Sequence, residues 1–493
     1  MIIFNLNYKR LIATVLTVAL VSCSNPWDDR ENNGDANLTV NLTEAIKSTA
    51  ETSQFAQLLS ETGYDKILAA SKTYTVFVPT DAAMAQVSDE ILNDPEALKQ
   101  FVGNHIALTA YSSARNEEET RIKMYSNKYL TFKGSTMIDD ATIVTANQYA
   151  KNGVFHIIDK PLSPKLNIWE YIKSQQGASA TSDYLLSLKD FNIYKSDSIG
   201  KALSEENGTG FLADSLTNSY LKNVYNLNNE AKSYTLFLME NDGYNQEVDK
   251  MKPYLIKTSN NPAIDSTAIY AKYFTLRDMA FYGKYEKDEL PATLISRFGV
   301  EVSIDKTQIV GEPIHLSNGI VYIMKKVDVP LIKRLLTTKL EGEDNKGFYN
   351  TGRNSIYYRE RREPLLDTLY TDLCVLNPGS ALPWITYSAK DFYSTKYKVY
   401  WRAINEQTNI FQQRVSLYGK SEIVNKITNF TDLIVEFPYI NVGLNSYQEV
   451  LIGEFTLTKA RDIDFISLIG ANNNTNGNNS LTLDYLKFVP VLK

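Results

Sequence analysis

Residues able to carry out acid–base, thiol or metal chemistry are few in this chain of 493 residues. The histidines are His105, His156 and His315, and the cysteines are Cys23 and Cys374. No Cys-X-X-Cys pair, His-Glu-X-X-His helix, phosphate-binding loop, nucleophile elbow or dinucleotide-binding glycine pattern occurs. Carboxylates are abundant, and glycoside hydrolysis needs only two at the right separation, but no pair is distinguished by its spacing. We therefore expect a protein that is not an enzyme, with no catalytic residue, metal ligand or cofactor.

Aromatic residues offer a different chemistry, because a sugar ring stacks on an exposed aromatic face while neighbouring polar groups bond its hydroxyls. The chain contains 32 tyrosines and 4 tryptophans, although many tyrosines are also typical of a β-rich chain. Trp384 follows a proline and precedes no clear strand, so exposure is plausible; the alternative is that it and Trp401 fill a core. The candidate glycan-binding residues are Trp384, Tyr387, Tyr393, Trp401 and Arg402.

The N-terminal segment has the features of an exported lipoprotein. A basic stretch at residues 8–10 precedes the apolar run 11–20, which is too short to span a bilayer. The sequence Val-Ser-Cys then ends at Cys23 and resembles a bacterial lipobox, in which the chain is cut before a cysteine that receives lipid. We expect residues 1–22 to be the signal peptide and Cys23 to be lipidated. The alternative is a plain signal peptide with an incidental cysteine.

The residues after Cys23 predict the destination of this anchor. The acidic sequence 24–31 resembles the export signal that sends lipoproteins to the cell surface in gut-type Gram-negative bacteria, although it could simply keep a tether solvated. Residues 23–37 are rich in Asn, Asp and Gly and predict a flexible tether. We expect a protein anchored in the outer membrane and exposed at the cell surface. Cys374 then has no disulfide partner, and its apolar surroundings predict a buried side chain.

Length and composition limit the remaining possibilities. A chain this long exceeds one hydrophobic core, so we expect two to four domains. Its 43% hydrophobic and 22% charged residues are ordinary for a folded protein. The net charge of −6 lacks the basic footprint of a nucleic-acid-binding protein. Nucleic acid is therefore not an expected partner.

Residues 38–165 predict a first α/β module. Helically spaced apolar residues precede the sequence TYTVFVPTDAAM at 73–84, in which a strand ends at a proline and Thr80 or Asp81 can cap the next helix. The sequence NGVFHIIDKPLSP follows at 152–164.

These two sequences resemble the two signature boxes of fasciclin domains. They stand in the family's order, about 75 residues apart, with FVGNHIA at 101–107 between them. The resemblance implies a compact module with a wedge-shaped β-sandwich and a helical layer. In the family the histidine is often preceded by tyrosine, a pair associated with adhesion in some members. Here Asn104 precedes His105.

Residues 166–331 resemble a second, divergent copy. The sequence SYTLFLMENDGY at 233–244 repeats the strand and acidic cap of the first box. The sequence LSNGIVYIMKKVDVP at 316–330 repeats the Asn-Gly turn, the apolar strand and the closing proline of the second box. An unrelated α/β domain with a coincidental Asn-Gly hairpin is the alternative.

The C-terminal part has a different pattern. We expect a polar linker over 332–347 and then, over 348–493, about eight strands separated by turns, which together favour a β-sandwich. The ending 481–491 resembles the closing strand of galactose-binding-like jelly rolls. The predicted fold class is thus multidomain, with two α/β fasciclin-like modules followed by an all-β jelly-roll-type sandwich.

Two functions are compatible with this organisation. The first is an accessory surface lipoprotein of a starch-utilisation-type outer-membrane importer, which binds glycan or packs against the transporter. The second is an adhesion or matrix-interaction protein, the commoner role of fasciclin domains. The sugar-binder-like sandwich and the missing Tyr-His pair favour the first.

Overall fold

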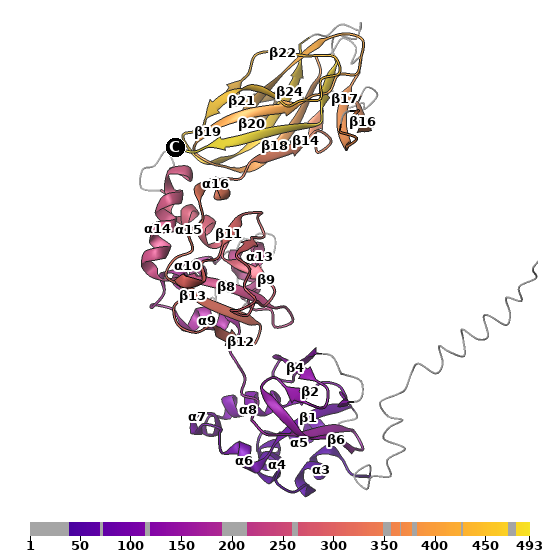
Figure 1. Ribbon diagram of the computed structural model, residues 1–493, viewed down its shortest axis with the longest axis vertical. Helices are drawn as coiled ribbons and strands as arrows, with labels where there is room; N and C mark the ends of the chain where they lie inside the picture. The colour runs from indigo at the N-terminus through magenta and orange to yellow at the C-terminus, as the bar shows by residue number, and fades with distance from the viewer. Residues whose placement is uncertain are drawn as a thin grey trace, which may run out of the picture. The chain divides into compact units, whose positions relative to one another are not determined.

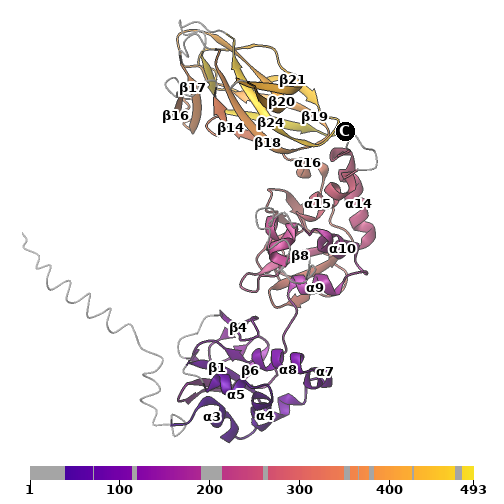
Figure 2. The same ribbon diagram turned by 180° about the vertical axis from the view of Figure 1, so that it is seen from behind.

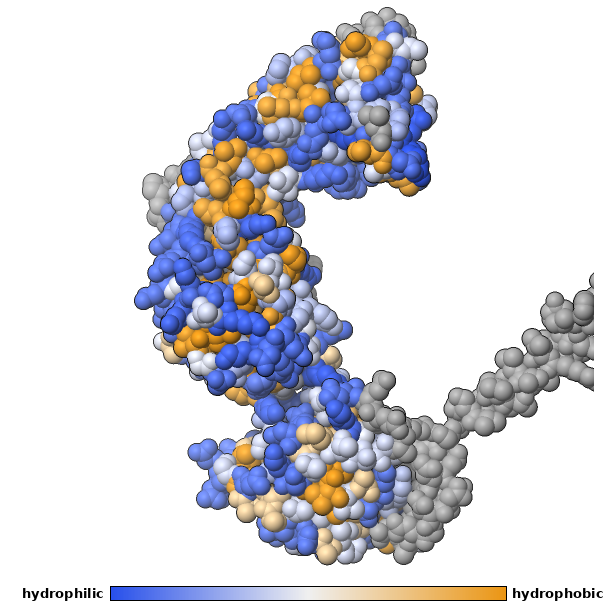
Figure 3. Space-filling view, viewed as in Figure 1, coloured by the Kyte–Doolittle hydropathy of each residue, from blue (hydrophilic) through white to orange (hydrophobic). Residues whose placement is uncertain are grey.

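The structure is a computed structural model (Figures 1 and 2) that divides into two compact units. The first comprises residues up to Ser174 together with Asn226–Tyr234 and His315–Ile320, and the second comprises the remainder. The expected signal peptide, Cys23 and the expected tether lie outside the described residues. Within the described residues no helix is long and apolar enough to cross a membrane. The viewed surface mixes hydrophilic residues with separate apolar patches (Figure 3). The structure describes residues 39–69, 72–113, 119–189, 214–258, 265–348, 356–364, 366–376, 382–424, 427–471 and 480–493, without the side chains of 215–216 and 421–429.

The first module is built around a seven-stranded sheet with the order β2-β1-β7-β6-β5-β4-β3. The two signature boxes form its centre, because β1 pairs with β7 in parallel, from Tyr74 opposite Gly153 to Pro79 opposite Ile158. The strands are β1 (Tyr74–Pro79), β2 (Ile106–Ala107), β3 (Thr120–Lys123), β4 (Tyr129–Lys133), β5 (Met137–Ile138), β6 (Ala141–Ala150) and β7 (Gly153–Ile158).

Alternation along β1 separates two hydrophobic clusters. Val76 and Val78 face the helices, whereas Phe77 faces the curled strands β3–β6, so the strand is buried on both sides. Thr80 caps α6 as expected, since its hydroxyl accepts the backbone N–H of Ala83 at 3.1 Å. The helices are α3 (Leu42–Ser48), α4 (Ser53–Glu61), α5 (Tyr64–Leu68), α6 (Asp81–Met84), α7 (Asp89–Asn93) and α8 (Pro95–Gly103).

The second module has a smaller sheet with the order β12-β13-β8-β9, which repeats the order β6-β7-β1-β2 of the first. Its strands are β8 (Tyr234–Met239), β9 (Ala280–Tyr282), β12 (Ile314–Leu316) and β13 (Gly319–Met324), with a separate pair β10 (Thr293–Ile295) and β11 (Glu301–Ser303). Its helices are α9 (Ile168–Ser174), α10 (Ala180–Ser187), α12 (Asp214–Thr217), α13 (Ser219–Asn223), α14 (Asn241–Met251) and α15 (Thr267–Leu276), with the 3-10 helices η4 (Lys252–Tyr254) and η5 (Lys306–Gln308).

Each module contains a corresponding side-chain hydrogen bond made by an asparagine. The amide oxygen of Asn152 accepts the N–H of Leu42 at the start of α3, at 2.8 Å. In the second module the amide oxygen of Asn318 accepts the N–H of Ile168 at the start of α9, also at 2.8 Å. Each asparagine precedes a glycine against which a tyrosine carbonyl packs too closely for a Cβ atom. The Asn-Gly pairs therefore have the same structural task.

The positions of His105 and His156 in the first module are occupied by Met279 and Tyr322 in the second. His156 bonds the carbonyl of Tyr111 through Nε2 at 3.0 Å, and Tyr322 donates its hydroxyl to a carbonyl at 2.8 Å from the same strand position. The carbonyl of His105 accepts an N–H from β1, and the carbonyl of Met279 accepts the corresponding N–H from β8. The hydrogen bonds at these positions are thus retained while the imidazoles are replaced.

The C-terminal part contains three sheets, with the orders β14-β26-β19-β23, β15-β18-β24-β20-β21 and β16-β17-β25; β22 also pairs with β20. The helix α16 (Leu331–Arg334) precedes them. Their strands are β14 (Thr338–Glu341), β15 (Gly347–Phe348), β16 (Ile356–Arg362), β17 (Leu369–Val375), β18 (Trp384–Phe392), β19 (Lys396–Arg402), β20 (Phe411–Val424), β21 (Ile427–Glu436), β22 (Ile440–Val442), β23 (Val450–Thr456), β24 (Arg461–Gly470), β25 (Leu481–Leu483) and β26 (Tyr485–Val491).

Two sequence predictions fail here. Residues 332–347 are not simply a linker, because they contain β14, which pairs with β26. Trp384 is not in a loop, because it begins β18, which lies between β15 and β24. Cys374 is buried, as expected.

Candidate functional site

Three of the predicted sugar-binding residues lie in the interior and cannot stack on a ligand. Tyr387 and Trp401 are each 1% exposed, and Tyr393 is 4% exposed. Tyr387 lies on β18, Tyr393 directly after β18 and Trp401 on β19, and each ring points inward. The hydroxyl of Tyr387 donates to the carbonyl of Gly342 at 2.9 Å, and that of Tyr393 to the carbonyl of Arg334 at 3.1 Å. The prediction was wrong for these three residues, which are core residues, and the hydroxyls of the two tyrosines are satisfied within the fold.

Arg402 is also committed to the fold. Its guanidinium contacts Glu363 and Asp484 at 2.5 Å each, and its Nε donates to the carbonyl of Tyr447 at 2.8 Å. All three nitrogens are therefore engaged, and the side chain is largely buried. The prediction of a glycan contact is wrong for Arg402, because binding a sugar would require an ion pair to break.

Trp384 is partly exposed and belongs to a group of four aromatic side chains from four strands. The rings of Trp384 and Phe430 are nearly perpendicular, and their centres lie 5.5 Å apart. Phe430 in turn stacks on Tyr418 at 5.2 Å and contacts Phe465 at 5.6 Å. We call Trp384, Tyr418, Phe430 and Phe465 the aromatic cluster. All four are partly exposed, so the cluster presents aromatic surface to solvent.

A row of small polar residues lies beside the aromatic cluster on the same sheet. Thr386 pairs with Ser467, and Ser467 pairs with Ser416, so their side chains share one face. The alternate residues Ile385 and Leu468 point to the core on the opposite face. We call Thr386, Ser416 and Ser467 the hydroxyl row. It is 5% exposed or less although it lies on the outer face, so something covers it.

The cover is the ribbon formed by β20 and β21. β20 pairs with β24 only over Gln413–Tyr418, and beyond Tyr418 it continues to Val424 paired only with β21. Phe430 lies in this overhanging part, opposite Ser421, yet its ring reaches Trp384 on β18. The ribbon therefore curls back across the sheet and places the Phe430 ring over the hydroxyl row.

The site contains unsatisfied donors and a neutralised ion pair. The hydroxyl of Ser467 is buried and has no hydrogen-bond partner among the described residues, and the same holds for Nε of Arg414. Arg414 contacts Glu436 at 2.6 Å, and its guanidinium lies 4.7 Å from the ring centre of Tyr439. The hydroxyl of Ser416 lies 3.3 Å from the Glu436 carboxylate. These groups can bind a hydroxyl-rich, uncharged ligand, but they include no nucleophile paired with a base.

Sequence reasoning missed every member of this site except Trp384. One usable signal was present: in the segment 413–418 the residues Arg414, Ser416 and Tyr418 alternate with apolar ones, which predicts that they share the outer face of a strand. The contribution of Phe430 depends on the ribbon's curl, for which the sequence has no local signal.

The histidines of the first module are unsuited to proton transfer. His105 and His156 are fully buried, and burial lowers the pKa of each to about 4. The imidazole of His105 bonds the carbonyl of Phe101 and accepts the N–H of Leu162, at 2.8 and 2.9 Å. Asn104 is equally buried, so this Asn-His pair is not accessible to a partner.

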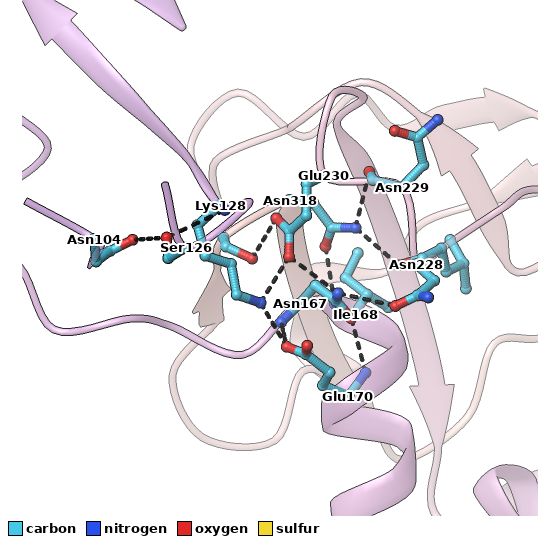
Figure 4. A network of polar contacts seen from close by, with 12 residues as sticks. Asn104, Ser126, Lys128, Asn167, Ile168, Glu170, Asn228, Asn229, Glu230 and Asn318 are labelled. Atoms are coloured by element: carbon cyan, nitrogen blue, oxygen red, sulfur yellow. Dashed lines mark hydrogen bonds and ion pairs between the residues drawn. The ribbon is translucent and has the colours of Figure 1, made fainter. Parts of the chain in front are cut away.

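A network of polar side chains in the first unit has a structural role (Figure 4). The ammonium of Lys128 lies 2.6 Å from Glu170 and 2.7 Å from Glu230. The amide of Asn167 donates to Glu230 at 3.0 Å, and the hydroxyl of Ser317 does so at 2.8 Å. Every charge in this network has a partner, and no group of three or more acidic, His or Cys residues in the described chain could hold a metal ion. The network joins the β3–β4 region to α9.

Comparison with known proteins identifies part of the chain. The family model of the fasciclin domain matches residues 50–164. The "Transforming growth factor-beta-induced protein ig-h3" of Oryctolagus cuniculus is 31% identical over 132 residues, which are 24% of this chain and 18% of the relative. The Sus scrofa protein of that name gives the same values. The chain thus spans 18% of the length of these curated relatives.

Solved structures match at low scores. A FAS1 domain pair from the insect cell adhesion molecule fasciclin I is 16% identical, with a TM-score of 0.23, and covers 57% of this chain and 97% of its own. A family 35 carbohydrate binding module from Clostridium thermocellum is 13% identical, with a TM-score of 0.21, and covers 32% of this chain and 99% of its own. Scores this low do not establish a common fold. Residues 50–164 are a fasciclin domain, and the chain is a multidomain protein in which this domain precedes a largely β C-terminal part.

Proposed function

We propose that this protein is a non-enzymatic, lipid-anchored protein of the bacterial outer membrane whose C-terminal sandwich binds glycan, as an accessory to a glycan uptake system. The lipobox-like sequence ending at Cys23 supports the anchor. The absence of catalytic motifs from the sequence supports a binding role.

The observation on which glycan binding depends is the aromatic cluster beside the hydroxyl row. Trp384 offers a ring for stacking, and the Ser467 hydroxyl and the Nε of Arg414 are buried donors without a partner among the described residues. Sugars present apolar C–H faces and many hydroxyls, which match this combination. The alternate function of the sandwich, packing against a transporter, would use the same partly apolar face.

The test is the Trp384→Ala variant of the full chain, titrated with neutral oligosaccharides of glucose, xylose and galactose. We expect binding to be lost, because one stacked ring contributes on the order of 1 kcal/mol to an already weak interaction. Stability should fall by only about 1–2 kcal/mol, less than the 3–5 kcal/mol typical of a fully buried aromatic, because Trp384 is partly exposed.

The matched control is Tyr400→Ala, which removes a similarly exposed aromatic residue from β19 in a different sheet. It should leave glycan affinity unchanged. If Trp384→Ala binds the oligosaccharides as tightly as the unaltered protein does, glycan binding at this face is refuted.

We further propose that residues 166–331 are a second, divergent fasciclin module. The repeated strand order and the matching bonds of Asn152 and Asn318 support this. An experimental structure in which Asn318 did not bond the start of α9 would contradict it. Two such modules also support the second candidate function, adhesion or matrix interaction, although the burial of Asn104 and His105 removes the pair associated with adhesion.

A further inference from the structure

Phe430 occupies the position that a ligand ring would take in the proposed glycan site. It is the only member of the aromatic cluster that contacts all three others in the described structure. It lies above the hydroxyl row, and beneath it the Ser467 hydroxyl has no partner within the described residues. A buried hydroxyl without a partner is unfavourable, and a ligand hydroxyl placed there would satisfy it.

The ribbon that holds Phe430 bends at a defined point. A bulge interrupts the pairing between Leu417 and Tyr418, and Gly419 follows. A Cβ atom at Gly419 would fall 2.0 Å from the carboxylate of Asp432 and 1.9 Å from the guanidinium of Arg461, so a larger residue would displace these two side chains. Asp432 itself has a left-handed backbone, with φ of 59°. The bend is therefore a local feature of β20 and β21.

The bend is fastened by a contact that can open. Asp432 and Arg461 form an ion pair at 2.9 Å, with side chains 47% and 33% exposed. Such exposed pairs contribute little to stability and are weakened by salt. The Phe430 ring is also only partly buried. Among the described residues, three ring contacts and one solvent-screened ion pair keep Phe430 against the sheet.

The charges at the site select the class of ligand. The positive charge of Arg414 is compensated by Glu436 at 2.6 Å, and the hydroxyl row is uncharged. Among the described residues of the site, an acidic sugar would find no uncompensated cation and would approach the Glu436 carboxylate. A neutral sugar needs only the stacking surface and the hydroxyl donors.

We infer that the Phe430 ring is a gate over the glycan site, and that a neutral glycan binds on Trp384 by displacing this ring. This inference rests on the proposed glycan-binding function. Binding includes the loss of the Phe430 ring contacts, so the closed gate lowers the observed affinity.

The test compares the full chain with its Phe430→Ala variant, titrated calorimetrically with neutral oligosaccharides and with uronic-acid oligosaccharides of equal length. Removing the gate ring should tighten binding of the neutral ligand about tenfold, since tenfold corresponds to about 1.4 kcal/mol, the order of one or two aromatic pairs. Asp432→Asn, which releases the bend but keeps Phe430, should tighten binding in the same direction by a smaller factor. Leu451→Ala removes an exposed apolar residue from β23 and should change nothing.

Each outcome is decisive. If the unaltered chain binds a neutral ligand and Phe430→Ala binds it equally or more weakly, the gate is overturned but the proposed function stands. Absence of binding in both proteins refutes the proposed function itself, whereas binding by Phe430→Ala alone supports a closed gate. Equal affinity for uronic-acid ligands overturns the neutral class. If Phe430→Ala fails to fold, Phe430→Leu keeps apolar bulk without the ring and carries the same expectation.

Discussion

Two neighbouring cations on the short helix α16 allow a sharp test of how burial determines the contribution of an ion pair. Arg334 is 2% exposed, lies 3.1 Å from Glu247, which is 1% exposed, and lies 3.9 Å from Asp278. The preceding residue, Lys333, also pairs with a carboxylate, Glu301, but both side chains are about half exposed. The two pairs differ mainly in their access to water.

Replacing Arg334 by alanine removes a cation from two buried carboxylates, of which Glu247 keeps the more exposed Lys250. Its guanidinium also donates to the carbonyls of Phe274 and Thr275 at 3.3 and 3.4 Å, at the end of α15. Burial already raises the pKa of Asp278, and loss of the guanidinium would raise it further. Breaking a buried pair from one side costs about 3–5 kcal/mol, whereas Lys333→Ala should cost less than about 1 kcal/mol.

Differential scanning calorimetry of the full chain measures both effects. For a unit of this size about 2 °C of Tm corresponds to 1 kcal/mol, so Arg334→Ala should lower the transition of the second unit by roughly 6–10 °C. Lys333→Ala should lower it by roughly 2 °C or less. The carbonyl of residue 334, which accepts the Tyr393 hydroxyl, remains in the variant, so the loss should originate in α14 and α15. Equal small shifts for the two variants would refute the reasoning.

Two further predictions concern the N-terminal half. First, the pKa of about 4 for His105 and His156 lies below the ordinary value, so the unfolded state binds more protons than the folded state between pH 6.5 and 4. The free energy of unfolding of the first module should therefore be fully present above pH 6.5. It should fall by on the order of 3 kcal/mol per histidine by pH 4. Urea unfolding across this range checks it, and an equally steep profile for His156→Gln would contradict it. Second, mass spectrometry of the native protein should find an acylated Cys23; a Cys23→Ala protein that still fractionates with membranes would exclude the lipid anchor.

Much of the α/β part can be predicted from local sequence. The Asn-Gly pairs, the apolar runs that follow them and the Thr80 cap are short-range signals, and the structure places them as strands and a capped helix. The proposed repeat was detectable because the same local sequence steps recur in residues 166–331, even where the side chains differ.

The sandwich was less predictable, because its strands depend on distant partners. β14 has the polar composition of a linker, and only its pairing with β26 makes it a strand. β18 alternates inward residues such as Tyr387 with outward polar ones such as Ser388, which resembles a loop when its neighbours are unknown. The aromatic cluster requires four strands in a particular register and a ribbon that curls, and no local pattern encodes either.

The replacement of the imidazoles in the second module separates the two units in their response to acid. At the positions of His105 and His156 the second module has Met279 and Tyr322, neither of which takes up a proton in mild acid. The raised pKa of Asp278 acts in the opposite sense, because protonation relieves a buried charge. An acidic surrounding would therefore make the first module the earlier target of proteases, while the part that includes the sandwich kept its resistance. With the lipid anchor proposed at Cys23, cleavage there would release the C-terminal part intact.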